Sequence, residues 1–137
     1  MRDDIGRFLE AQEEMYGIAL EELMEGRKRS HWIWYIFPQL RGLGRSYNAD
    51  YYGISGLEEA KEYLKNPILR NRLFELCEIL LQSSHDDATV IFGDLDAMKL
   101  RSSMTLFDAV EPDSIFDKVI TKFFDGQRCH HTLQILN

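Results

Sequence analysis

The chain has 137 residues, of which 45% are hydrophobic, so we expect a single domain spanning residues 1–137 with a core of its own. Aromatic residues make up 12% of the chain, which excludes an intrinsically disordered protein. The formal net charge of −7, from 16 Lys+Arg and 23 Asp+Glu, argues against non-specific binding to nucleic acid but leaves room for a local basic site.

The cysteines and the ends of the chain indicate the cellular setting. Cys77 and Cys129 allow one disulfide at most, and the absence of a CxxC pair argues against a structural zinc site. The first residues lack the apolar run of a signal peptide, and no apolar stretch approaches membrane-spanning length. We therefore expect a cytoplasmic protein with no membrane partner. No Walker loop, GxGxxG, GxSxG or HExxH motif occurs, so we expect no cofactor and no metal.

The first half of the chain predicts one long helix followed by irregular structure. Apolar residues at helical spacing over residues 4–25 predict an amphipathic helix, which ends at Gly26. The aromatic and β-branched run Ser30–Pro38 is compatible with a strand or with a short helix. Residues 39–56 contain four glycines and predict a long ordered loop holding short turns.

The second half predicts a succession of helices. They cover residues 57–64, 67–82, where Pro67 suits the first turn, 94–110 and a segment holding Ile115–Phe124, with short pieces at 88–92 and 132–136. Cys77 lies in an apolar stripe and is interpreted as a core residue. With about six helices and no βαβ alternation, the sequence predicts a compact all-α domain.

One segment stands out by its charge. No acidic residue occurs between Glu25 and Asp50, although the chain is acidic overall. The segment carries five basic residues, a histidine and both tryptophans: Arg27, Lys28, Arg29, His31, Trp32, Trp34, Arg41 and Arg45. Arginine forks bind phosphate and aromatic faces stack on bases, so this composition suits a planar anionic ligand.

Structural roles for the same residues remain open. Arg27–Arg29 can complement the negative end of the preceding helix, and the aromatic side chains can belong to the core. His31 borders the segment and can change charge near neutral pH, which makes it the histidine of most interest. The alternative is a half-buried histidine that bonds to backbone.

A second cluster lies in the helix predicted at 94–110. Asp96, Lys99, Ser102 and Ser103 share one face at helical spacing. Lys99 with the serines can bind phosphate, and the spacing also allows a Ser–Lys nucleophile pair. Alternatively, the hydroxyls bond back to the preceding turn. His130 and His131 adjoin Cys129, but adjacent side chains diverge, so the sequence does not predict a metal site there.

Several strings together resemble a known family. They include His31-Trp32-Ile33-Trp34, Gly42-Leu43-Gly44, Ile91-Phe92-Gly93 and Lys99-Leu100-Arg101-Ser102-Ser103-Met104-Thr105-Leu106-Phe107. The chain is similar over nearly its whole length to the bacterial family called domain of unknown function 1810, whose members are often labelled calpastatin. The resemblance implies an all-α fold and no established activity. The calpastatin label disagrees with this composition, because such inhibitors are disordered repeats. The family usually has an aspartate where this chain has Cys129.

The two clusters lead to a hypothesis about function. We expect them to meet, with Arg27, His31, Arg41, Arg45, Lys99 and Ser102 lining one pocket for a phosphorylated, nucleotide-like small molecule. A distant likeness to ADP-ribose-linked helical hydrolases suggests cleavage at an N-glycosidic bond, with Asp96 or His31 as the catalytic group. The alternative is a non-catalytic module that binds a protein or nucleic acid through the same basic aromatic surface. The full set of candidate ligand-binding residues is Arg27, Lys28, His31, Trp32, Trp34, Arg41, Arg45, Lys99, Ser102 and Ser103. The sequence indicates no oligomeric state.

Overall fold

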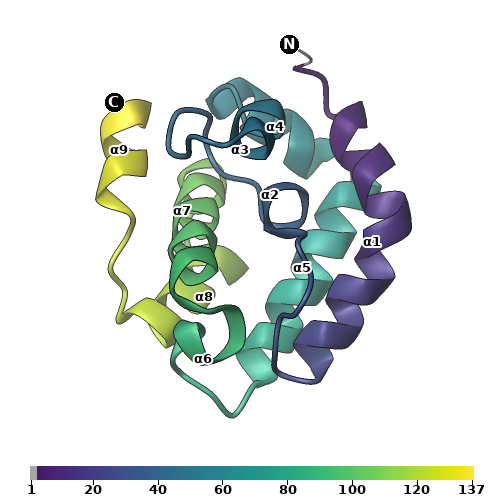
Figure 1. Cartoon of the computed structure of the whole chain (residues 1–137). Coiled ribbons are helices and arrows are strands. Elements are labelled where there is room, and N and C mark those ends of the chain that lie inside the picture. The colour runs from purple at the N-terminus through teal and green to yellow at the C-terminus, as the bar shows by residue number, and fades with distance from the viewer. Residues whose placement is uncertain (1–2) are drawn as a thin grey trace.

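A computed structural model describes residues 3–137, which form nine α-helices connected by loops (Figure 1). Their bounds are α1 Gly6–Met24, α2 Ile33–Ile36, α3 Tyr47–Tyr51, α4 Leu57–Lys65, α5 Pro67–Gln82, α6 Ala88–Phe92, α7 Asp94–Val110, α8 Ile115–Phe124 and α9 His130–Leu136. Within this part of the chain there is no strand, and a single parallel bridge joins Leu40 to Ile54. The predicted all-α class is confirmed. The number of helices exceeds the expected six because short helical turns form in α2, α3 and α6.

The two longest predicted helices of the second half have the expected bounds, because their ends carry clear local signals. Before α5 the Asn66 side chain accepts hydrogen bonds from Ile68 N and Leu69 N, and Pro67 occupies the first turn. Before α7, Gly93 has φ +80°, a backbone conformation that favours glycine.

Helix α7 forms the centre of the core. It packs against α8, α6, α4 and α9, while α1 packs along α5 on the other side of the molecule (Figure 1). Its residues Leu100, Met104 and Phe107 are fully buried, and Cys77 of α5 lies 3.8 Å from the Met104 sulfur, as expected of a core cysteine. The element that carries the second predicted cluster is therefore anchored on several sides.

A buried ion pair ties the start of α1 to α4. Arg7 is fully buried, and its Nη1 lies 2.6 Å from the Glu59 carboxylate. The same guanidinium donates to the backbone carbonyls of Tyr51 and Gly53. The loop that contains α3 is thus held against α1 by hydrogen bonds as well as by packing.

The run Ser30–Pro38 takes the second of its two predicted alternatives and forms a short helix. Only Ile33–Ile36 are helical, and Trp32, Ile33 and Phe37 are buried. Glu22 of α1 organises the turn before it by accepting hydrogen bonds from Arg29 N at 2.8 Å, Ser30 N at 3.0 Å and Trp32 Nε1 at 3.0 Å. One carboxylate of α1 therefore fixes the path of the basic segment.

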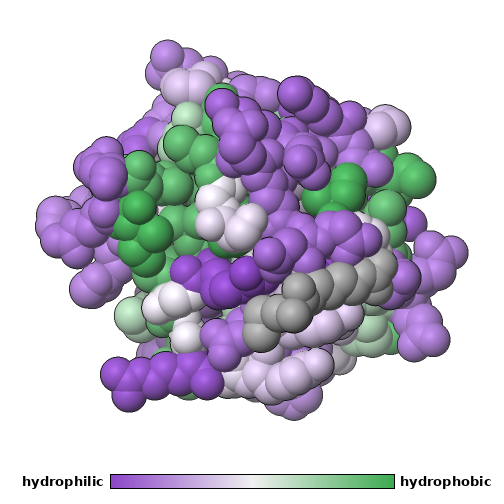
Figure 2. Space-filling view, turned by 90° about the horizontal axis from the view of Figure 1, so that it is seen from above, coloured by the Kyte–Doolittle hydropathy of each residue, from purple (hydrophilic) through white to green (hydrophobic). Residues whose placement is uncertain are grey.

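The predicted long loop is ordered and pinned at both ends. Arg41 N donates to Ile54 O, and Ile54 N donates to Gln39 O, both at 2.9 Å. Between these bonds the chain forms α3, whose first turn is capped by the Ser46 hydroxyl. Viewed from above, hydrophilic residues cover most of this end of the molecule and divide the hydrophobic patches (Figure 2). No helix among residues 3–137 is long and apolar enough to span a membrane.

Candidate functional site

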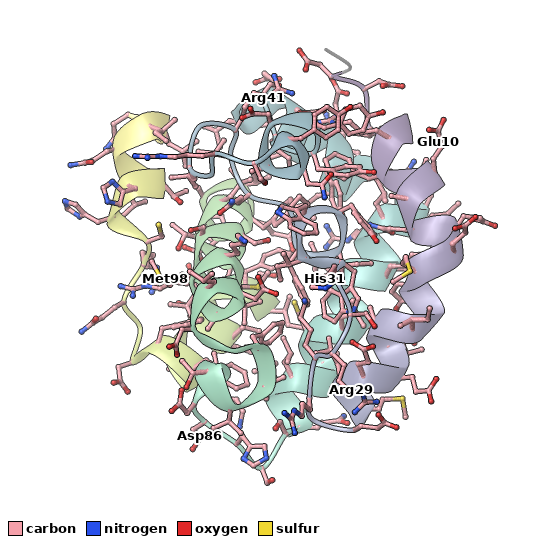
Figure 3. All side chains as sticks on the ribbon, in the orientation of Figure 1. Glu10, Arg29, His31, Arg41, Asp86 and Met98 are labelled. Carbon is pink, nitrogen blue, oxygen red and sulfur yellow. The ribbon has the colours of Figure 1, made fainter. Side chains whose placement is uncertain are left out.

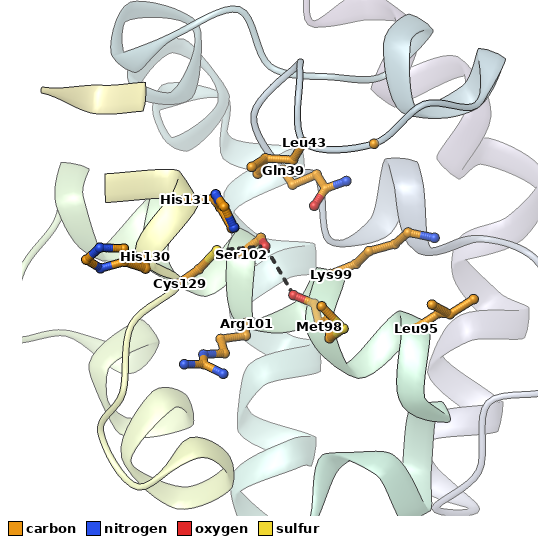
Figure 4. A pocket seen from close by; sticks show the side chains of 11 residues that line it. Gln39, Leu43, Leu95, Met98, Lys99, Arg101, Ser102, Cys129, His130 and His131 are labelled. Atoms are coloured by element: carbon orange, nitrogen blue, oxygen red, sulfur yellow. Dashed lines mark hydrogen bonds between the residues drawn. The ribbon is translucent and has the colours of Figure 1, made fainter. Parts of the chain in front are cut away.

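A cavity of about 400 Å³ lies between α7, the start of α9 and the loop after α2 (Figure 4). Helix α7 provides one wall, the turn into α9 a second, and the loop covers the top. The lining residues are Gln39, Leu43, Gly44, Leu95, Met98, Lys99, Arg101, Ser102, Cys129, His130 and His131.

The cavity wall is free of carboxylates. None of these eleven residues is acidic, whereas the chain as a whole has a net charge of −7. Lys99 and Arg101 supply positive charge, and two histidines lie beside Cys129. A neighbouring hollow shares Leu43 and His131 with the cavity, contains Arg45 and also has no acidic residue. In an acidic protein, a continuous surface of this kind attracts anions.

The two clusters singled out in the sequence do meet, at Asp96. Its carboxylate lies 2.6 Å from Lys28 Nζ and 3.5 Å from Lys99 Nζ. Two ammonium groups on one carboxylate leave an excess positive charge at this point. Each lysine also lies over a tryptophan ring, Lys28 at 4.8 Å from the Trp32 centroid and Lys99 at 5.4 Å from that of Trp34.

The hydroxyl groups of α7 mostly bond back to the preceding turn, as the structural alternative predicted. Thr105 Oγ1 donates to Arg101 O at 2.8 Å, and Ser102 Oγ lies 3.1 Å from Met98 O. Ser103 is fully buried and its hydroxyl has no hydrogen-bond partner among the described residues. Of the two serines, only Ser102 reaches the cavity.

Gln39 is a polar side chain that the fold leaves without a partner. The residue is 7% exposed, and no residue of the described chain forms a hydrogen bond with its side-chain amide. In Figure 4 this side chain extends from the loop toward the space above α7. The amide atoms are not among the fully buried polar atoms that lack a partner, so this side chain meets open space, where a donor and an acceptor are available for a ligand or for water.

Arg101 connects α7 to the segment before α9. Its Nε donates to Gln127 O at 3.0 Å and its Nη2 to Arg128 O at 3.3 Å, so its hydrogen bonds go to backbone carbonyls. The guanidinium also lies 5.8 Å from the centroid of Phe124. Its positive charge is held at the cavity wall without a carboxylate among these partners.

Cys129 lies at the junction between α7 and α9. Its backbone N donates to Thr105 Oγ1 at 2.9 Å, and its sulfur lies 3.3 Å from Ser102 Oγ. Burial alone would raise the pKa of the Cys129 thiol, but the Ser102 hydroxyl and the nearby backbone N–H groups of His131 and Thr132 lower it below its usual value. Cys77, in contrast, has its pKa raised by complete burial.

Several predicted ligand-binding residues lie outside the cavity. Trp32 is fully buried and donates to Glu22, so it belongs to the core. Arg41 forms an ion pair with Asp3 at 2.7 Å. Arg27 and His31 are exposed and line none of the hollows described, and in Figure 3 His31 lies to the right of α7 while the cavity residue Met98 lies to its left.

The two candidate catalytic residues do not reach the cavity either. Asp96 does not line the cavity, and its carboxylate forms ion pairs with Lys28 and Lys99. His31 does not line the cavity either. The residues that the sequence analysis missed are Gln39, Arg101, Cys129 and the two histidines after it. Of these, the string Cys129-His130-His131 was visible as a cluster, but only the fold brings it to α7. No group of three or more His, Cys, Asp or Glu side chains between residues 3 and 137 is arranged to hold a metal ion.

Comparison with known proteins places the chain in a family. No curated protein matches it. The crystal structure of the conserved hypothetical protein Rv1873 from Mycobacterium tuberculosis is similar, with a TM-score of 0.94 and 43% sequence identity over 97% of this chain and 96% of that one. The profile of the family described as protein of unknown function (DUF1810) matches residues 2–136. The chain therefore belongs to the DUF1810 family.

Proposed function

We propose that this protein binds a small phosphorylated, nucleotide-like molecule in the cavity between α7, α9 and the loop after α2. The observation that carries the proposal is the wall itself, which has two cationic side chains, two histidines and no carboxylate in a protein of net charge −7. Such a wall favours a ligand with negative charge. The cavity volume of about 400 Å³ is within the range of small-molecule sites.

The wall offers a different contact to each part of such a ligand. Lys99, which shares the Asp96 carboxylate with Lys28, and Arg101, which is held by backbone carbonyls, supply positive charge for a phosphate. Arg45 in the adjoining hollow extends this charge for a second one. Leu43, Leu95 and Met98 form apolar surface for a planar body. The Gln39 amide can hydrogen-bond to a base or sugar, because it presents both a donor and an acceptor.

The proposal concerns binding, and ADP-ribose is one of its concrete candidates. Hydrolysis of an N-glycosidic bond requires a group that protonates the leaving atom or activates water. Asp96 and His31, the two groups considered for this role, do not line the cavity. Turnover is therefore tested separately, by chromatography of each ligand after prolonged incubation with the protein.

The first experiment measures thermal unfolding with adenosine, AMP, ADP, ADP-ribose and inorganic phosphate, each over a concentration series. A ligand that binds only the folded state at about 100 times its Kd adds about 2.7 kcal/mol of stability, which is a shift of several degrees. We expect the phosphorylated compounds to raise the melting temperature more than adenosine does, and Lys99→Gln to reduce the shift.

Lys61→Gln is the matched control, because it removes the same charge from an exposed position on α4, where Lys61 pairs with its neighbour Glu58. An equal shift in the Lys99 variant and in the wild type would contradict the proposed location. No shift with any phosphorylated compound would reject the ligand class and favour the interaction module. Trp32 cannot serve such a module directly, since its ring is fully buried.

A further inference from the structure

The cavity contains a nucleophilic side chain that binding alone does not need. Cys129 is partly exposed, lines the cavity and has its backbone fixed by the hydrogen bond to Thr105. In Figure 4 its sulfur lies beside Ser102 at the base of His131. The side chain is therefore accessible from the cavity and held by neighbours on α7.

Ser102 can stabilise both protonation states of this sulfur. Its Oγ lies 3.1 Å from Met98 O and 3.3 Å from Cys129 Sγ. A hydroxyl has one proton, so it donates to the carbonyl while the thiol donates to it, and turns to donate to the sulfur once the thiol has ionised. The pKa of Cys129 is lowered accordingly, whereas that of Cys77 is raised.

A second, independent feature suits the binding of a polar molecule in the space next to this sulfur. Gln39 is more than nine-tenths buried, yet its amide has no hydrogen-bond partner among the described residues and extends into the same cavity. Lys99 and Arg101 also line the cavity and extend in opposite directions from α7 (Figure 4), with no carboxylate in the lining. The space next to Cys129 thus suits a polar, negatively charged molecule.

We propose that Cys129 forms a mixed disulfide with an anionic, low-molecular-weight disulfide that docks in this cavity. The thiol first loses its proton to solvent. The thiolate then attacks one sulfur of the incoming disulfide, so that a bond between Cys129 Sγ and that sulfur forms while the original S–S bond breaks. The leaving sulfur keeps the electron pair and takes up a proton from solvent. One disulfide is consumed and one is formed, so no further oxidant is required.

The modification would regulate the site proposed above. An anionic thiol attached to Cys129 fills the cavity and lies near Lys99 and Arg101. Other anions can then no longer bind there. This regulatory consequence rests on the proposed function, but the reaction at Cys129 does not. The two are therefore tested by different readouts.

The test incubates the folded full-length protein with oxidised glutathione, which is anionic, with the neutral bis(2-hydroxyethyl) disulfide and with the cationic cystamine. Intact-mass spectrometry follows the rate of each reaction, and peptide mapping locates the adduct. We expect one adduct, at Cys129, and a preference for the anionic over the cationic reagent several-fold greater than that of a small free thiol. Cys129→Ser should form no adduct, and Cys77→Ser should react as the wild type does.

The charge dependence is tested with variants and with salt. Lys99→Gln should slow the reaction with oxidised glutathione several-fold and leave the neutral reagent unaffected, while Lys61→Gln should change neither. If the Lys99 variant unfolds, the wild type in high salt tests the same point, because screening should remove the anionic preference. Equal reactivity of Cys77 and Cys129, or the charge preference of a free thiol, would overturn the proposal.

The outcomes for the two proposals are distinguishable. Selective modification without any thermal shift from phosphorylated compounds would reject the proposed ligand and keep the reactive cysteine. A thermal shift without an adduct would keep the proposed ligand and reject the reactive cysteine. If both hold, a bound phosphorylated ligand should protect Cys129 from oxidised glutathione.

Discussion

Replacing Glu22 by glutamine tests whether one carboxylate organises the basic segment. Glu22 is 5% exposed and accepts hydrogen bonds from Arg29 N, Ser30 N, the Ser30 hydroxyl and Trp32 Nε1. Glutamine keeps the shape but has one acceptor oxygen and places an NH₂ group against donors. The variant therefore loses charge-assisted bonds and leaves buried N–H groups unpaired.

The magnitude follows from the pKa of this carboxyl. Burial alone would raise the pKa of Glu22, but the hydrogen bonds from Ser30, Arg29 and Trp32 lower it from 4.5 to about 2. A difference of this size corresponds to about 3 kcal/mol at neutral pH, and allowing for screening by solvent we expect Glu22→Gln to cost about 2 kcal/mol. For a domain of this length the melting temperature should fall by roughly 8 °C.

The lowered pKa of Glu22 also predicts the direction in which stability changes with pH. Because the folded pKa lies below that of the unfolded chain, the stabilisation is complete above about pH 4.5 and is lost as the pH falls toward about 2. Urea denaturation at several pH values should show the wild type and the Glu22→Gln variant converging in acid. Glu21→Gln removes the same charge from an exposed neighbour and should have little effect. Equal stability of the two variants at pH 7 would refute the reasoning.

Three further substitutions test the packing and the ion pair described above. Arg7→Ala should destabilise the fold by about 3 kcal/mol or more, because it leaves the buried Glu59 without its partner; urea denaturation measures this, and a loss below about 1 kcal/mol would contradict it. Gly53→Ala should lower the melting temperature, since a β-carbon there would lie 2.6 Å from Ala49 O and from Arg41 Cα. Gly17→Ala, in the exposed middle of α1 with nothing within 4 Å, should instead add about 0.8 kcal/mol by reducing the entropy of the unfolded chain, and a decrease would refute the helix assignment there.

The helices that the sequence predicted best are those with local signals at both ends. The bounds of α5 follow from Asn66-Pro67 and from an apolar stripe that includes Leu69, Leu73 and Leu76. The run Ser30–Pro38 carries no such information, because residues 32–37 are aromatic or β-branched without a polar face. Its path is fixed by Glu22, a residue of the preceding helix that nothing in the run itself identifies.

The site was predicted in part, and the reason lies in contacts between distant segments. Lys99 and Ser102 were identified from the spacing on one helix face, and both line the cavity. Lys28 and Arg41 carry the right charge, but they are paired with Asp96 and Asp3, which come from other parts of the chain. Gln39 had no distinguishing chemistry in the sequence, and Cys129 was considered only with the adjacent histidines as a metal site. Their importance appears only when the loop and α9 are placed against α7.

The parallel bridge between Leu40 and Ile54 lies at the base of the loop that covers the cavity. The hydrogen bonds on either side of it close the intervening segment at its base, so that the fixed part ends at Arg41 and Ile54. Lengthening a closed loop costs only about 0.6 kcal/mol for each doubling. Leu43 and Gly44, which cover the cavity, lie in this segment ahead of α3, whereas Tyr51 and Gly53 at its end are tied to α1 by Arg7; the cavity floor lies on α7. A change of length around Leu43 and Gly44 would therefore alter the cover of the cavity and leave its floor on α7 in place.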